Sequence, residues 1–145
     1  MKILVAVDGS VHALDAVKHL IEHVNWYRDP PTVVLMFVHP PLPRPPYMAL
    51  DANQLQSYYQ QEGDAALAKA KEMLDLAGIA YTADIRVGPI AESIVKHARV
   101  AGCDLILMST RGIGAGGNLL LGSTATKVLY FSATPVLIVN SMVSF

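Results

Sequence analysis

A glycine-rich segment is the part of this sequence whose residue types are best suited to chemistry. Residues 109–124 read STRGIGAGGNLLLGST and contain five of the ten glycines in the chain. Glycine lets a backbone approach a ligand closely, and the exposed N–H groups at the start of a helix attract anions. The segment follows the apolar run DLILM and leads toward ATKVLYF, as a turn between a strand and a helix would. The pattern therefore predicts a turn that binds phosphate groups, and it leaves open which phosphate compound is bound.

Two widespread phosphate-loop patterns fit this segment poorly. The Walker pattern requires Gly, four residues, Gly-Lys and then Ser or Thr. Gly117 and Gly122 have that spacing, but Ser123 stands where the lysine is required. The dinucleotide pattern G-x-G-x-x-G is met by Gly112, Gly114 and Gly117, yet it follows the fourth predicted strand and no acidic residue comes after it. A P-loop NTPase and a dinucleotide oxidoreductase are therefore disfavoured, and glycines that only permit a tight turn remain an alternative.

The spacing of apolar residues predicts the elements that must position this turn. Continuous β-branched runs predict buried strands, and helical periodicity predicts the helices between them. Ser10 is the expected N-cap of the first helix, Gly78 stops the second, and Pro89 lies in the first turn of the third. The predicted strands are 2–8, 32–39, 80–87, 104–108 and 135–139, and the predicted helices are 10–26, 51–77, 88–102 and 118–132.

Strands that alternate with helices predict a parallel sheet covered by helices on both faces. Such a sheet binds ligands at the C-terminal ends of its strands, where the strand order reverses. Two loops would then matter most: VDGS at 7–10, after the first strand, and the glycine-rich segment after the fourth. If these two strands are neighbours, both loops face one crevice. The strand at 80–87 alternates more than the others, which is typical of a sheet edge.

Five segments spread along the whole chain resemble one known family. They are VAVDGS, AESIVKHA, CDLILMSTRG, LLLGSTATKVL and TPVLIV, and in this order they are similar to the universal stress protein family. With this resemblance, we expect a single doubly wound α/β domain over residues 1–145. Its five-stranded parallel sheet should have the order 3-2-1-4-5, with helices on both faces.

The resemblance also implies a nucleotide site, because the ATP-binding branch of the family carries Gly, two residues, Gly, nine residues, Gly and then Ser or Thr. Gly112, nine residues and Gly122-Ser123 match this pattern, whereas Ser109 stands at the position of the first glycine. The Ser109 side chain would either crowd the ligand or add a hydrogen bond. In this interpretation the glycines admit phosphate oxygens to the backbone, and the hydroxyls of Ser123 and Thr124 donate to them.

The remaining members of the implied site come from the strand ends. The aspartate that matches the family, Asp8, would hold the nucleotide through the ribose or through a metal ion at the phosphates. Val7 and Val38 would line the adenine slot, Met108 would pack near the sugar, and Arg111 would reach a phosphate or point to solvent. The full set of expected nucleotide-binding residues is Ala6, Val7, Asp8, Val38, Met108, Ser109, Arg111, Gly112, Gly122, Ser123 and Thr124.

The function implied by this site is binding of ATP, with or without Mg²⁺, or of a related adenine nucleotide by a stress-response sensor. We expect a binding module without catalytic residues, because no residue stands out as a general base and the Walker lysine is missing. Two alternatives stay open. One is a family member that has lost nucleotide binding and acts through dimerisation and protein partners. The other is a slow Mg²⁺-dependent ATPase or phosphotransferase.

Composition predicts the compartment and the partners. A net charge of −1 without a basic block disfavours nucleic acid and acidic membranes as partners, and no apolar run approaches the ~20 residues of a membrane helix. The first residues lack the features of a signal peptide, and the single Cys103 fits a reducing compartment, so we expect a cytoplasmic protein. The hydrophobic last strand, 135–139, predicts pairing into a homodimer, as the resemblance also implies.

Three further features receive a structural interpretation. His12, His19 and His23 lie within about 40° of one another on a helical wheel, and such a stripe could share a metal, but it lies opposite the apolar face and is interpreted as solvated. The sequence has no G-x-S-x-G elbow, which disfavours a serine hydrolase. Tyr58 and Tyr59 are interpreted as packing or interface residues, and the proline-rich segment 40–49 as a lid or a stiff spacer.

Overall fold

The structure is a computed structural model that describes residues 1–43, 50–111 and 121–141. Within these residues, strands and helices alternate along the chain as the periodicity predicts. The elements are β1 (Lys2–Ala6), α1 (Leu14–Glu22), the 3₁₀ helix η1 (Val24–Trp26), β2 (Thr32–His39), α2 (Ala52–Leu76), β3 (Tyr81–Val87), α3 (Ile90–Val100), β4 (Leu105–Ser109), α4 (Ser123–Phe131) and β5 (Val136–Val139).

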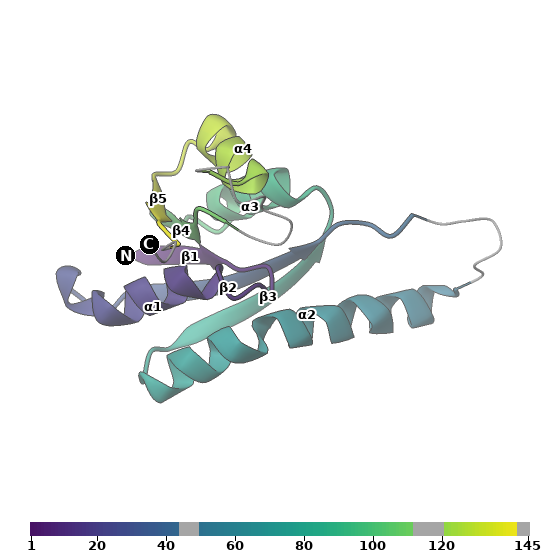
Figure 1. Ribbon diagram of the computed structural model, residues 1–145, viewed down its shortest axis with the longest axis horizontal. Helices are drawn as coiled ribbons and strands as arrows, with labels where there is room; N and C mark the ends of the chain where they lie inside the picture. The colour runs from purple at the N-terminus through teal and green to yellow at the C-terminus, as the bar shows by residue number, and fades with distance from the viewer. Residues whose placement is uncertain (44–49, 112–120, 142–145) are drawn as a thin grey trace.

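The strands form one parallel sheet in the order β3-β2-β1-β4-β5, which confirms the expected topology (Figure 1). Strand β1 lies in the middle, where Ile3 pairs with Val33 of β2 on one side and with Leu105 of β4 on the other. The C-terminal ends of β1 and β4 are therefore neighbours, as a shared crevice requires. Strand β3 lies at one edge, as predicted from its alternation, and β5 lies at the other.

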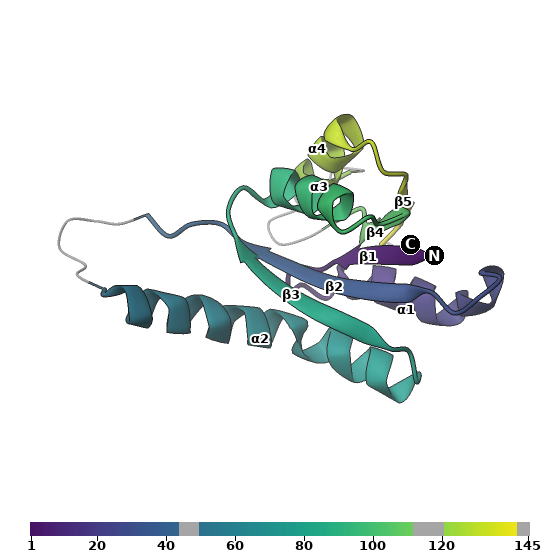
Figure 2. The same cartoon turned by 180° about the vertical axis from the view of Figure 1, so that it is seen from behind.

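The helices cover both faces of the sheet, as predicted (Figure 1, and from behind in Figure 2). Helices α1 and α2 pack on one face, where Leu20 and Leu67 meet Val5 of β1 in one buried cluster. Helices α3 and α4 pack on the other, where Ile94 and Val128 belong to a second cluster. Successive strand residues join alternate clusters because their side chains point to opposite faces. This alternation decides which strand-end side chains can meet at the site.

The first helix is shorter than predicted, and Ser10 is not its N-cap. Helix α1 begins after Ala13, and a separate 3₁₀ turn follows at Val24–Trp26, so the prediction of one helix over 10–26 is wrong. The reason lies in a local side-chain interaction: the Ser10 hydroxyl donates to Asp8 and accepts the N–H of Ala13 at 3.1 Å. Polar side chains that bond the backbone in this way stabilise turns in competition with helix. Strand β1 likewise ends at Ala6, two residues before the predicted end.

The other helix ends follow local signals more closely. Asp51 caps α2 in a capping box with Gln54, and Gly78, with a φ of +70°, ends the helix where predicted. Pro89 is the N-cap of α3, one position before the helix. Helix α4 begins at Ser123, so the predicted helix over 118–132 is wrong at residues 121 and 122. The predicted start at 118 lies outside the described residues.

Candidate functional site

Three apolar side chains from neighbouring strand ends lie on one face of the sheet. Ala6 of β1, Val38 of β2 and Met108 of β4 all belong to the cluster shared with α3 and α4, and each is less than a tenth exposed. Val7 belongs to the opposite cluster, with α1 and α2, and its N–H donates to the Met36 carbonyl at 3.0 Å. Any contact of Val7 with a ligand on the first face would therefore come from its remaining backbone atoms.

The carboxylate of Asp8 is held in a defined orientation at the end of β1. Its Oδ1 accepts the backbone N–H of Ser10 at 2.9 Å and also the Ser10 hydroxyl. Gly9 between them has a φ of +84°, which favours glycine in this turn. Asp8 is half-buried. A carboxylate oriented in this way is suited to accept hydroxyl groups of a sugar or to ligate a hard cation such as Mg²⁺.

The serine at the first glycine position of the motif has its side chain engaged within its own loop. Ser109 ends β4 and is 5% exposed, and its Oγ donates to the carbonyl oxygen of Arg111 at 2.6 Å. Strand alternation places its side chain on the side of Leu107, opposite to that of Met108. The hydroxyl therefore organises the backbone that leaves β4, and Arg111 itself is half-exposed.

The start of α4 is pressed against the end of β4 at Gly122. Its N–H donates to the Thr110 carbonyl at 2.6 Å, and a Cβ at position 122 would stand 3.0 Å from that oxygen. Gly122 is the N-cap of α4 and has no side chain to cap the first turn, which also contains no acidic residue. The first N–H groups of a helix carry partial positive charge and attract anions. Ser123 is exposed and Thr124 half-exposed in this turn, whereas Gly112 lies outside the described residues.

Two buried polar residues at this end of the sheet were not identified from the sequence. Thr110 and Ser141 are 5% and 6% exposed, and the Ser141 N–H donates to the Thr110 Oγ1 at 3.1 Å. No motif marks this pair, because the two residues are 31 positions apart and each follows an ordinary strand. The only signal in the sequence is the hydroxyl residue between Ser109 and Arg111.

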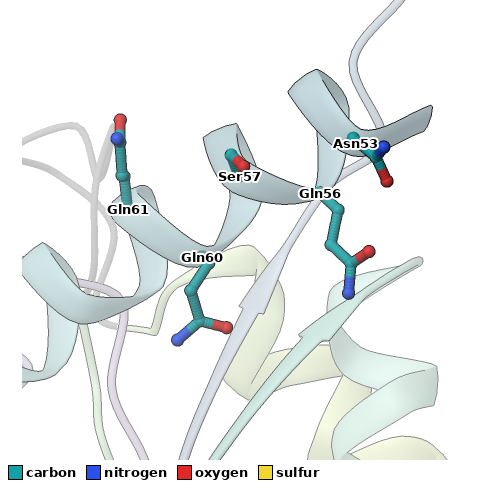
Figure 3. Close-up of a pocket in the computed structure, with 5 residues that line it drawn as sticks. All are labelled: Asn53, Gln56, Ser57, Gln60 and Gln61. Atoms are coloured by element: carbon teal, nitrogen blue, oxygen red, sulfur yellow. The ribbon is translucent and has the colours of Figure 1, made fainter. Parts of the chain in front are cut away.

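Two hollows lie along α2, away from the strand ends that would form the predicted crevice. One is lined by side chains on the exposed part of the helix, shown in Figure 3: Asn53, Gln56, Ser57, Gln60 and Gln61. The other lies between α2 and the edge strand, where Tyr59 faces Ile85 and Val87. The residues that line them carry amide, hydroxyl, aromatic or aliphatic side chains and none is charged, so the two hollows do not resemble a phosphate site.

The tyrosines at 58 and 59 are packing residues, in agreement with the prediction. The ring centroid of His39 lies 5.7 Å from that of Tyr58 and 5.1 Å from that of Tyr59. The Tyr59 hydroxyl accepts the N–H of Leu42 at 2.8 Å, which ties the beginning of the proline-rich segment to α2. The choice between a lid and a spacer for 40–49 depends on residues 44–49, which lie outside the described residues.

The histidine stripe on α1 is only partly solvated. His12 is exposed, but the ring of His19 stacks on that of His23 with centroids 4.2 Å apart, and Trp26 extends the stack. Burial lowers the pKa of His19, the neighbouring His23 lowers it further, and Glu22 opposes the shift. In the described part of the chain, no three His, Cys, Asp or Glu side chains are grouped as a metal would need. No helix among the same residues has the length and apolar character to cross a membrane.

The comparison with family models decides the family. The model described as universal stress protein family matches residues 1–140. The chain belongs to the universal stress protein family. Universal stress protein MJ0531 of Methanocaldococcus jannaschii is 31% identical over 143 residues, which cover 96% of this chain and 81% of that protein. Universal stress protein YxiE of Bacillus subtilis is 33% identical over 151 residues, covering 96% of this chain and 98% of that protein.

Solved structures of this family share the fold. The structure of MJ0577, also from M. jannaschii, superposes with a TM-score of 0.72 at 27% identity, over 99% of this chain and 97% of the other. A universal stress protein in complex with cAMP superposes with a TM-score of 0.72 at 22% identity, over 98% of each chain. A family protein from Arabidopsis thaliana with AMP bound has a TM-score of 0.69 at 16% identity, over 98% and 92%. The last two similarities, at 22% and 16% identity, show a shared fold alone.

Proposed function

We propose that this universal stress protein binds an adenine nucleotide, with ATP as the first candidate, between the Asp8 turn and the start of α4. The observation that carries the proposal is the close approach of Gly122 to Thr110. It brings an N-terminal helix turn without an acidic residue to the end of β4, beside the strand that ends near Asp8. Two structures of the same fold contain cAMP and AMP, which adds support for the adenine class.

The proposal gives the residues at the strand ends distinct roles. The base and sugar would lie over the apolar side chains of Ala6, Val38 and Met108, with the backbone of Val7 beside them. Asp8 would accept the ribose hydroxyls or ligate Mg²⁺ at the phosphates.

The phosphates would be bound by the glycine-rich segment and the first turn of α4. Gly112 and Gly122 would admit the phosphate oxygens, and the hydroxyls of Ser123 and Thr124 would donate to them. Arg111 would neutralise phosphate charge at the same end of the sheet. Ser109 would order the backbone between residues 109 and 111 through its hydrogen bond to the Arg111 carbonyl. One domain over 1–145 carries the whole site in this proposal.

In this proposal the protein is a cytoplasmic binding module that reports on nucleotide in a stress response, and it turns ATP over slowly if at all. The carboxylate of Asp8 does bond the Ser10 hydroxyl, but that hydroxyl also accepts the N–H of Ala13 and holds the turn after β1, so we assign the pair a structural role. A family member that acts only through dimerisation and protein partners is the competing function.

Chromatography of the nucleotide released on denaturation of the purified protein tests this directly. It is combined with thermal unfolding in ATP, AMP or cAMP, with and without Mg²⁺. A ligand at 100 times its Kd should add about 2.7 kcal/mol to the free energy of unfolding. Asp8→Asn keeps an acceptor for Ser10 but removes the charge, so it should weaken binding of Mg²⁺-ATP most. Asp29→Asn, which neutralises an exposed aspartate in the segment before β2, serves as the matched control. No released nucleotide and no stabilisation at millimolar ligand would show that the protein acts without nucleotide.

We also propose that two copies pair through β5. Within the described residues this strand pairs only with β4, so its other edge offers unpaired backbone groups. The end of α4, next to β5 in Figure 1, exposes Leu129, Tyr130 and Phe131, of which Tyr130 is 83% exposed. Apolar side chains grouped beside an open strand edge favour an interface with a second copy.

A further inference from the structure

Thr110, at the end of β4, forms hydrogen bonds with three different parts of the molecule. Its N–H donates to the carbonyl of Val139 in β5 at 2.9 Å, and its carbonyl accepts the N–H of Gly122 at 2.6 Å. Its hydroxyl Oγ1 accepts the N–H of Ser141 at 3.1 Å. The residue is 5% exposed, so water does not easily replace these partners. One buried residue thus connects β4, the exit of β5 and the start of α4.

Ser141 extends this connection to the loop that follows β1. Its Oγ donates to the carbonyl oxygen of His12 at 3.3 Å, across 129 positions of sequence. His12 belongs to the short turn that Ser10 organises, because the Ser10 hydroxyl bonds both Asp8 and the N–H of Ala13. The exit of β5 therefore contacts one side of the crevice through Ser141 and the other side through Thr110.

We propose that Thr110 and Ser141 form a latch that sets the distance between the two sides of the candidate site. Thr110 is in this view a positioning residue, since it acts through Gly122 on one side and through Ser141 and His12 on the other. Removal of its hydroxyl would leave the buried N–H of Ser141 without its acceptor, and such an N–H has a strong tendency to move toward solvent. The exit of β5 would then shift, and both crevice sides would lose their common support.

Amide hydrogen exchange tests the latch without any ligand. Thr110→Val removes the hydroxyl and keeps the branched shape, whereas Thr110→Ser keeps the hydroxyl. In Thr110→Val we expect exchange about five- to tenfold faster at Ser141, and also at Gly122 and Ala13, the size of one lost hydrogen bond. Thr110→Ser should restore slow exchange at all three amides. Acceleration that stays confined to Ser141 would overturn the latch, because the two sides would then be independent of it.

The effect on ligand affinity rests on the proposed function and is measured separately. ATP titration of the same variants should show binding about five- to tenfold weaker in Thr110→Val and restored in Thr110→Ser. Gly63→Ala, which we expect to destabilise the protein in α2, away from the latch, because an added Cβ would stand 2.5 Å from Ile85, should bind ATP as the wild type does. Unchanged affinity in Thr110→Val, in a protein whose wild type binds ATP, would overturn the positioning role. If the wild type binds no nucleotide, the proposed function fails, and the exchange result alone decides the latch.

Discussion

The backbone of α2 touches β3 at Gly63, where an added Cβ would stand 2.5 Å from the Cδ1 atom of Ile85. Two further Ile85 atoms would lie within 2.7 Å, and Gly63 is buried. The absence of a side chain at this position therefore lets the long helix lie flat on the edge strand. Because β3 has a sheet neighbour on one side only among the described residues, this contact stabilises an exposed edge of the fold.

We predict that Gly63→Ala destabilises the protein. Overpacking costs typically about 1–3 kcal/mol, and the higher helix propensity of alanine returns up to about 1 kcal/mol. Urea unfolding should therefore show a net loss, although alanine is the better helix former. Ala68→Gly, at an exposed position of the same helix, measures the propensity difference alone.

The double variant Gly63→Ala/Ile85→Ala then tests whether the contact with Ile85 causes the loss of stability in Gly63→Ala. The two substitutions should cost less together than the sum of each alone, because Ile85→Ala removes the atoms that clash. Additive effects, or a Gly63→Ala protein as stable as the wild type, would contradict the close approach.

Restoring the family glycine at position 109 should change stability more than ligand binding. Ser109→Gly removes the buried bond to the Arg111 carbonyl and adds backbone freedom, so we expect a loss of about 1–2 kcal/mol in unfolding free energy. The affinity for ATP should stay within about threefold of wild type, because the Ser109 side chain lies on the side opposite Met108. Ser109→Ala isolates the hydroxyl. A tenfold gain in affinity in Ser109→Gly would mean that the serine crowds the ligand.

The stability of the protein should fall as the pH falls below about 6.5 because of His19. Burial lowers the pKa of this imidazole in the folded state from its ordinary value of 6.5, and the shielded Nε2 has no partner among the described residues. The unfolded chain then binds more protons below pH 6.5, so acid favours unfolding, and the full stability is present above that pH.

Thermal unfolding between pH 5 and pH 8 tests this assignment. His19→Phe keeps an aromatic ring in the stack and should make the melting temperature less dependent on pH. His12→Gln replaces an exposed histidine of the same region and should leave the dependence unchanged. An equal pH dependence in His19→Phe and wild type would mean that other groups cause it.

The proposed homodimer makes a prediction about single backbone groups of β5. The carbonyls of Pro135 and Val139 accept the N–H groups of Ile106 in β4 and of Thr110 directly after it, so the N–H of Ile138 points away from that strand. Ile138→Pro should prevent pairing with a second copy, whereas Ile138→Ala loses side-chain packing but keeps the N–H. Light scattering should give twice the chain mass of 15.6 kDa for wild type and for Ile138→Ala, and the chain mass for Ile138→Pro. A dimeric proline variant would show that another surface is used.

Much of the fold could be predicted from the sequence because the responsible signals are local. Apolar runs and, for the edge strand at 80–87, alternation of apolar and polar residues identified all five strands. Gly78 marked the end of α2 through its left-handed backbone conformation. The error at the first helix also has a local cause, which is the hydrogen bond from Ser10 to Asp8 in the turn after β1. Hydrophobic periodicity carries no information about such a bond. The start of α4 was misplaced because Gly122 is fixed by a contact with Thr110, outside the helix itself.

The candidate site also has some features that could be predicted from the sequence and others that only the folded chain shows. The motif spacing named Gly122 and Ser123, and the family resemblance named Asp8. Strand alternation follows from the order of residues alone. The face on which Val7 lies, the inward bond of Ser109 and the pairing of Thr110 with Ser141 came only from the folded chain. Strand periodicity acts between residues a few positions apart, so the order of residues determines it. Bonds such as that from Ser141 to His12 join groups 129 positions apart, and only the packing of helices on both faces of the sheet brings them within reach.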